Sequence, residues 1–161
     1  DPLIVNILRD GKPIVDKGIF DPLQRLLKAG RIRPTPESVH TYFSRAPQTI
    51  LNSKWHVIQA TMDLYWAVID AAHAALMSLN QVPPSPGHVH EYIQEKLVKP
   101  GLIDKKYSII MKRFYDLSKM ITHREISEIP GHHYDNYLAE AEDFVNAMQE
   151  FIENNRKKAK K

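Results

Sequence analysis

The stretch LNSKWHVIQATMDLYWAVIDAAHAALMSL, residues 51–79, decides the fold of this chain. Its apolar side chains recur at spacings that alternate between four and three residues, which is the period of one face of an α-helix. Other apolar residues and several alanines occupy the remaining faces, so neighbouring helices or a partner chain must cover this segment on most sides. We therefore expect it to be the central helix of a bundle. The seam comprises Leu51, Trp55, Ile58, Met62, Tyr65, Ile69, Ala72 and Leu76.

Helix start and stop signals surround this segment. Thr35 caps a preceding helix, in which Pro47 is expected to cause a kink or a restart. A proline-rich loop at residues 80–92 leads into a short helix, Asp104 caps the next one, and a last helix is expected at about residues 135–155. The sequence thus predicts an all-α fold, an antiparallel bundle of four to five helices.

The N-terminal part has a different pattern. LIVNILR and KPIVD are apolar, β-rich runs on either side of Asp10 and Gly11, a pair typical of tight hairpin turns. We therefore expect an N-terminal β-hairpin, followed by a short helix that begins near Asp21. A two-stranded hairpin is marginal in water by itself, so it needs a sheet that the remaining sequence does not supply. The predicted division is an appendage of residues 1–34 and a helical bundle of residues 35–161.

Composition excludes several kinds of site. The chain has 161 residues and a net charge of +3 at pH 7. We expect its basic end, NRKKAKK, to be a solvated tail, with contact to a nucleic acid as the alternative. With no cysteine it has no disulfide, thiol nucleophile or thiolate ligand. Charged residues and histidines interrupt the longest apolar stretch, which argues against a membrane span, and no targeting motif occurs. A cytoplasmic protein without contact to a membrane is the expectation.

Three segments carry a resemblance to a known family. LYWAVIDAAHAALMSL (residues 64–79), VPPSPGHVHEYI (residues 82–93) and the last two helices follow one another as in the HEPN family (higher eukaryotes and prokaryotes nucleotide-binding), which residues 38–152 resemble. Upstream, NILRDGKPIVDKGIFDPLQRLL is similar to the closing hairpin and helix of a minimal nucleotidyltransferase domain. The resemblance implies a homodimer, a nucleotidyltransferase domain or subunit as partner, and a chain that is the C-terminal part of a longer enzyme or has lost its catalytic domain.

The sequence predicts no catalytic residues for nucleotidyl transfer. That reaction needs a Gly-Ser loop for the triphosphate and paired carboxylates for magnesium. None of the six glycines is followed by serine, and no paired acids lie in the predicted hairpin. Many HEPN proteins are instead metal-independent ribonucleases, in which an arginine is followed after four to six residues by a histidine. Arg113 and His123 are ten residues apart, and seven residues separate Arg124 from His132. Both pairs depart from that motif, so RNA is the less favoured partner.

The segment MITHREISEIPGHHYDNYL, residues 120–138, holds the most informative candidates. Arg124 continues an apolar seam, so we expect its stem to point inward and its guanidinium to have a partner. That partner is either an internal one (Asp63, Asp70 or a helix-end carbonyl) or the phosphate of a ligand. His132 and His133 follow the Pro-Gly break, where they either form a capping turn or meet a phosphate beside Arg124.

The resemblance and the helix pattern add further candidates. Asp63 and Asp70 lie on one stripe of the central helix among alanines, which suggests a polar groove or a close helix contact. His73 matches a histidine of the family motif, with a satisfied core histidine as the alternative. His88, in the first turn after the proline loop, is placed near the same cleft by the resemblance, with a capping or solvent-exposed residue as the alternative. The predicted nucleotide- or phosphate-binding set is Arg124, His132, His133, Asp70, Asp63, His73 and His88, and no metal site is expected.

The resemblance and these residues lead to one hypothesis and two rivals. The main hypothesis is a non-catalytic nucleotide- or substrate-binding and dimerisation domain associated with a minimal nucleotidyltransferase, with a nucleoside triphosphate as ligand and no other cofactor. The rivals are a divergent, toxin-like HEPN ribonuclease and a purely structural dimer module whose polar residues are internal ion pairs.

Overall fold

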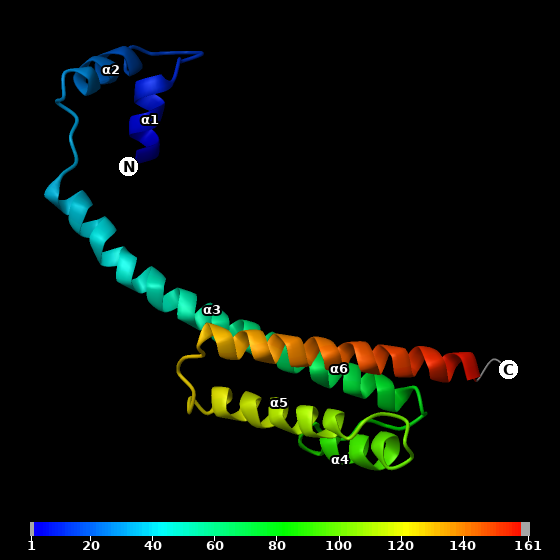
Figure 1. Cartoon of the computed structure of the whole chain (residues 1–161). Coiled ribbons are helices and arrows are strands. Elements are labelled where there is room, and N and C mark those ends of the chain that lie inside the picture. The colour runs from blue at the N-terminus through cyan, green and yellow to red at the C-terminus, as the bar shows by residue number, and fades with distance from the viewer. Residues whose placement is uncertain (1, 159–161) are drawn as a thin grey trace. The chain divides into compact units, whose positions relative to one another are not determined.

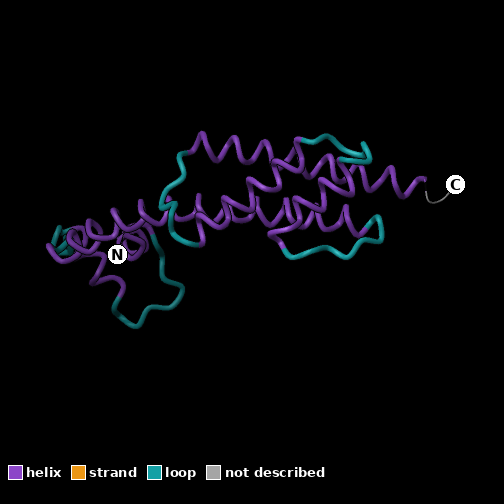
Figure 2. Tube along the Cα trace, turned by 90° about the horizontal axis from the view of Figure 1, so that it is seen from below, coloured by secondary structure: helices purple, strands orange, loops and turns teal. Residues whose placement is uncertain are grey.

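The computed structural model describes residues 2–158, and within that range every regular element is helical (Figures 1 and 2). No strand occurs among these residues, so the predicted all-α class is confirmed. Two compact units are present, Asp1–Thr49 and Ile50–Lys161. The elements are α1 (Pro2–Asp10), α2 (Phe20–Lys28), α3 (Pro36–Met77), η1 (Pro86–His88), α4 (Val89–Ile93), η2 (Gln94–Val98), α5 (Lys106–Thr122) and α6 (Gly131–Lys158).

The predicted N-terminal β-hairpin is wrong. Pro2–Asp10 forms α1, and the backbone N–H of Gly11 extends the helical pattern by donating to the carbonyl of Ile7 at 2.8 Å. The reason is that no other strand lies within residues 2–158 to pair with this segment, whereas a helix satisfies its backbone groups internally. The short helix expected after it is present as α2.

The first unit leaves most of its large apolar side chains in solvent. Leu8 is buried, but Ile14 and Phe43 are among the most exposed hydrophobic residues of the described chain. Within this unit Gln24 ties α2 to the end of α1, because its side-chain amide donates to the carbonyl of Gly11 at 3.2 Å. The unit therefore forms helices but buries few of their apolar side chains in a core.

The long helix α3 crosses from one unit to the other without a restart. Pro47 lies inside it, so the loss of one backbone hydrogen bond at the proline does not end the helix. In the second unit the predicted seam is buried at Ile58, Tyr65, Ile69, Ala72 and Leu76. The start of this seam is not buried, since Leu51 and Trp55 are exposed. The burial predicted for those two residues is wrong, because the helices that cover the later turns of α3 leave these two residues open.

The core of the second unit joins α3 to the helices that lie beside it (Figure 1). Polar contacts fix the ends of these helices: the amide of Asn155 donates to the carbonyl of Ser78 at 2.8 Å, and the hydroxyl of Ser108 donates to the carbonyl of His90 at 3.2 Å. The fully buried side chains that form the centre are Val68, Leu76, Val89, Ile93, Leu97, Met111, Phe114, Phe144 and Met148.

Two further expectations concern the surface. α6 continues to Lys158, while residues 159–161 of the expected basic tail lie outside the described residues. Within the described residues, none of the helices combines the length and the apolar character that a membrane crossing requires.

Candidate functional site

The end of α5 places Arg124 differently from the sequence prediction. The helix ends at Thr122, and the backbone N–H of Arg124 donates to the carbonyl of Ile121 at 3.0 Å. Arg124 has a φ of 60°, in the left-handed region that glycine usually occupies after a helix. Its side chain is exposed, so the prediction that it continues the buried seam is wrong. The physical reason is that the helical period stops before position 124.

Arg124 lines a groove between α3 and the end of α5, which we call the tryptophan groove. Its volume is about 590 Å³, within the usual range for small-molecule sites. α3 contributes polar and aromatic residues that recur at helical spacing on one face. The groove is lined by Trp55, Ile58, Gln59, Met62, Asp63 and Trp66 of α3, and by Ile121, Thr122, Arg124, Ile126 and Ser127.

Aromatic surface and unpaired charge coincide in this groove. Trp55 is 57% exposed and Trp66 is 54% exposed. Among residues 2–158, the guanidinium of Arg124 and the carboxylate of Asp63 form no ion pair or side-chain hydrogen bond, although both line the same groove. The internal partner predicted for Arg124 is therefore not seen. Because both groups keep their hydrogen-bonding capacity, they are available to a ligand.

A second groove adjoins the first and shares Met62, Trp66 and Thr122 with it. This groove, of about 390 Å³, brings together His88, which follows the proline loop, and Lys119 of α5. The Nδ1 of His88 lies 3.1 Å from a carboxylate oxygen of Glu91. Lys119 lies over the ring of Tyr115, with its Nζ 5.5 Å from the ring centroid. Trp66 thus lines both grooves, and each groove also contains a cationic side chain.

The floor of the adjoining groove contains a buried tyrosine. Burial raises the pKa of Tyr65, whereas a hydrogen bond with Ser118 lowers it to a smaller extent. Tyr65 also lies against Trp66, with ring centroids 5.0 Å apart. The phenol therefore contacts the ring of Trp66 and, in its neutral form, adds no charge to the groove.

The structure separates the predicted histidine pair from Arg124. His132 and His133 lie in the first turn of α6, with ring centroids 4.3 Å apart. His133 lines a different pocket with Arg113, Tyr137 and Glu140. In that pocket Arg113 and Glu140 form an ion pair across α5 and α6. The predicted placement of a histidine of this pair beside Arg124 is not seen, because Arg124 lines another pocket.

The remaining predicted residues on α3 do not line either groove. Asp70 is exposed, seven residues after Asp63, and lines none of the pockets described here. His73 is half-buried, and its Nε2 is buried with no hydrogen-bond partner among the described residues. The structure thus brings Asp63, Arg124 and His88 to adjoining grooves and leaves Asp70, His73, His132 and His133 outside them.

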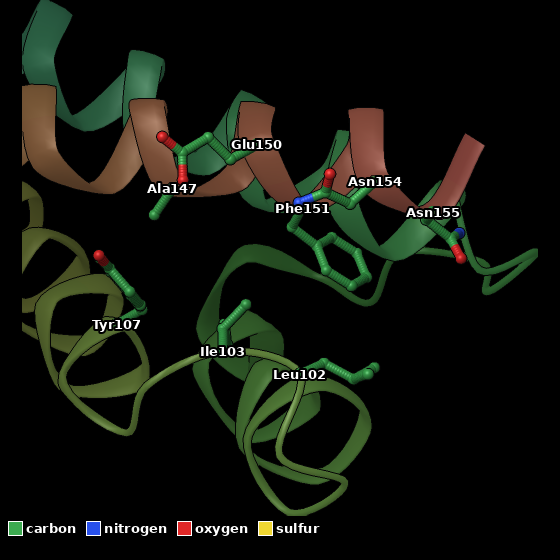
Figure 3. Close-up of a pocket in the computed structure, with 8 residues that line it drawn as sticks. All are labelled: Leu102, Ile103, Tyr107, Ala147, Glu150, Phe151, Asn154 and Asn155. Atoms are coloured by element: carbon green, nitrogen blue, oxygen red, sulfur yellow. The ribbon is translucent and has the colours of Figure 1, made fainter. Parts of the chain in front are cut away.

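A further pocket lies near the other end of α6, where Phe151 points toward the loop that carries Leu102 and Ile103 (Figure 3). Glu150 and Asn154 line it, and among residues 2–158 no lysine, arginine or histidine does. Without a cation, this pocket is poorly suited to a phosphate. Residues 2–158 also contain no group of three or more histidine, aspartate or glutamate side chains that could hold a metal ion.

The sequence prediction missed the two exposed tryptophans, Gln59 and Lys119. A signal was available for Trp66, since it lies one position beyond the seam residue Tyr65, where a large aromatic side chain is not needed for packing. Comparisons of the chain with protein-family models, curated proteins and solved structures give no significant match.

Proposed function

We propose that the second unit binds a nucleotide in the tryptophan groove, as the non-catalytic binding and dimerisation domain associated with a minimal nucleotidyltransferase. One observation carries this proposal: Arg124, with no ion-pair partner among residues 2–158, lines the same groove as the exposed ring of Trp66. Stacking of a base on an aromatic ring contributes about 1–3 kcal/mol. A guanidinium binds a phosphate through two parallel hydrogen bonds, and this planar fork adds specificity to the charge.

The other polar side chains of the groove have roles that fit the same ligand. Asp63 precedes Trp66 by three residues, which places the two side chains on neighbouring positions of one helix face. Its carboxylate can only accept, so it suits the hydroxyl groups of a ribose next to a base stacked on Trp66. The amide of Gln59 can donate and accept, as the edge of a base requires.

Titration with a nucleoside triphosphate, monitored by calorimetry, tests this proposal. We expect Arg124→Ala to weaken binding at least tenfold, because Arg124 is the one cationic side chain that the described residues contribute to the tryptophan groove. Arg124→Lys is expected to restore part of the affinity, since an ammonium keeps the charge without the planar fork. Arg156→Ala is the matched control, because Arg156 is exposed and lines none of the described pockets. Equal affinities for wild type and Arg124→Ala would overturn the proposal.

Exposed apolar residues support the dimerisation part of the proposal. In the second unit Ile50, Leu51, Val82 and Ile109 are among the large hydrophobic side chains that remain in solvent. Burial of such surface between two copies is favourable by about 25 cal/mol per Å². The apolar residues that α1 exposes are consistent with a further protein partner for the first unit. Sedimentation equilibrium at tens of micromolar tests self-association, and a strict monomer would contradict it.

One observation favours RNA cleavage as a second candidate function. Arg113 and His133 line the same pocket, although they are not the pairs that the sequence suggested. An arginine and a histidine together could offset phosphate charge and transfer a proton. The ion pair with Glu140 neutralises Arg113, however, so this pocket has less positive charge to offer than the tryptophan groove. RNA cleavage that is lost in His133→Ala and retained in Arg124→Ala would favour this second function.

A further inference from the structure

The two tryptophans of the chain both line the tryptophan groove, and their spacing limits what they can hold together. Trp55 and Trp66 are eleven residues apart on α3. Eleven residues make close to three helical turns, so the two side chains leave the same face of the helix, about 16 Å apart along its axis. Both side chains on one helix face tilt in the same direction, which preserves this separation toward the groove.

A single base cannot contact both rings at this separation. Stacked rings lie about 5 Å apart between centroids, so two rings that hold one base between them need to be about 10 Å apart. Each tryptophan therefore offers its own stacking surface. A mononucleotide would use one of the two and leave the other in solvent.

Two contacts indicate where Arg124 lies relative to these stacking surfaces. Thr122, two residues before it, lines the adjoining groove together with Trp66, which places the end of α5 near that tryptophan. Glu128, four residues after it, forms an ion pair with Lys54 at 2.8 Å, which places the following loop beside the turn of α3 that carries Trp55. The chain thus runs along α3 from Trp66 toward Trp55, and Arg124 falls on the way.

We infer that the tryptophan groove takes a dinucleotide, in which two bases stack on Trp55 and Trp66 and the phosphate bridge between them binds Arg124. This inference rests on the proposed function and narrows its ligand. The other polar residues fit the same arrangement, because Gln59 lies one turn from Trp55 and Asp63 lies one turn from Trp66. Each ring therefore has a polar neighbour that can meet the sugar or base beside it.

The two tryptophans also supply the test, because single-tryptophan proteins report on each stacking surface separately. In Trp55→Phe the fluorescence comes from Trp66 alone, and in Trp66→Phe it comes from Trp55 alone. Both replacements keep an aromatic ring, and both sites are exposed, so the core is unaffected. Each variant is titrated with AMP, with diadenosine diphosphate (a 5′–5′ pyrophosphate bridge) and with the 3′–5′ dinucleotide ApA. Thermal unfolding by circular dichroism confirms that both variants fold.

The inference predicts that at least one dinucleotide quenches both tryptophans and binds at least tenfold more tightly than AMP. Tighter binding of diadenosine diphosphate indicates a free pyrophosphate-linked dinucleotide as the ligand, whereas tighter binding of ApA indicates a segment of nucleic acid. Trp55→Ala should reduce the affinity for the dinucleotide to that for AMP. If AMP and both dinucleotides bind equally and quench one tryptophan, the inference is overturned while nucleotide binding stands. If none of the three ligands binds, both are overturned.

Discussion

Replacing Arg124 with glycine separates two effects of this residue: the destabilisation caused by its backbone conformation, and the contribution of its side chain to nucleotide binding. The φ of 60° costs a non-glycine residue about 1–2 kcal/mol. Glycine removes this strain, but its greater conformational freedom in the unfolded chain cancels about 0.5–1 kcal/mol of that stabilisation. Since the guanidinium forms no ion pair or side-chain hydrogen bond among residues 2–158, the replacement removes no polar contact of the side chain. We therefore expect Arg124→Gly to stabilise the fold by about 0.5–1 kcal/mol while it loses nucleotide affinity.

Urea denaturation followed by circular dichroism measures this change, and thermal unfolding should show a rise of about 2–4 °C for each kcal/mol in a chain of this size. Arg124→Ala is the matched control for the side chain, because alanine keeps the strained φ and should leave stability within about 0.5 kcal/mol of wild type. Asn80→Gly is the control for the backbone, since Asn80 has a φ of 56° after α3 and lines neither groove. It should be slightly more stable and bind nucleotide normally.

The opposite result would refute the reasoning. Destabilisation of both Arg124→Gly and Arg124→Ala by more than about 1 kcal/mol would mean that the guanidinium holds the fold together through an internal partner. Arg124 would then be a structural residue, as the rival hypothesis of a purely structural module requires.

Three further predictions concern the stability of the second unit. Met148→Ala should lower the free energy of unfolding by about 2–5 kcal/mol in urea, since Met148 is fully buried in the core and its truncation leaves a cavity. Asn155→Ala should cost about 1 kcal/mol in the same assay, because the carbonyl of Ser78 loses its donor. Burial raises the pKa of Tyr65, so the folded state holds the phenol proton more tightly than the unfolded state. The free energy of unfolding should therefore fall as the pH rises above about 10. Measured across that pH range, the fall should be shallower in Tyr65→Phe, which has no phenol proton to lose.

The helical bundle could be predicted because its signals are local. The alternating spacing of Ile58, Tyr65, Ile69, Ala72 and Leu76 is the helical period itself, and each of these residues is buried. The prediction of an N-terminal hairpin was wrong, although it also rested on local signals. The Asp10-Gly11 turn and its apolar flanks are a strong local signal, but strands need partners, and none lies within residues 2–158.

The site could be predicted only in part, because it depends on where α5 ends. Continuing the helical period through Thr122 would have buried Arg124, whereas the actual helix end turns the chain out and leaves Arg124 exposed. Asp63, which lines the groove, was a candidate because it lies among alanines on the central helix. His133 was expected beside Arg124 from sequence proximity, yet the loop between α5 and α6 carries it to the pocket of Arg113. Helix periodicity cannot predict such a displacement, since it depends on the path of a loop.

The most direct test of nucleotide binding in the tryptophan groove is a ¹⁵N–¹H correlation spectrum recorded during titration with a nucleoside triphosphate. The chain has two tryptophans, so its indole N–H groups give two resolved signals, both from this groove. We predict that the indole signal of Trp66 and the Nε–H signal of Arg124 shift together, with one dissociation constant, while the backbone signals around Arg113 and His133 stay in place. Shifts at Arg113 and His133 without any change at Trp66 or Arg124 would contradict it.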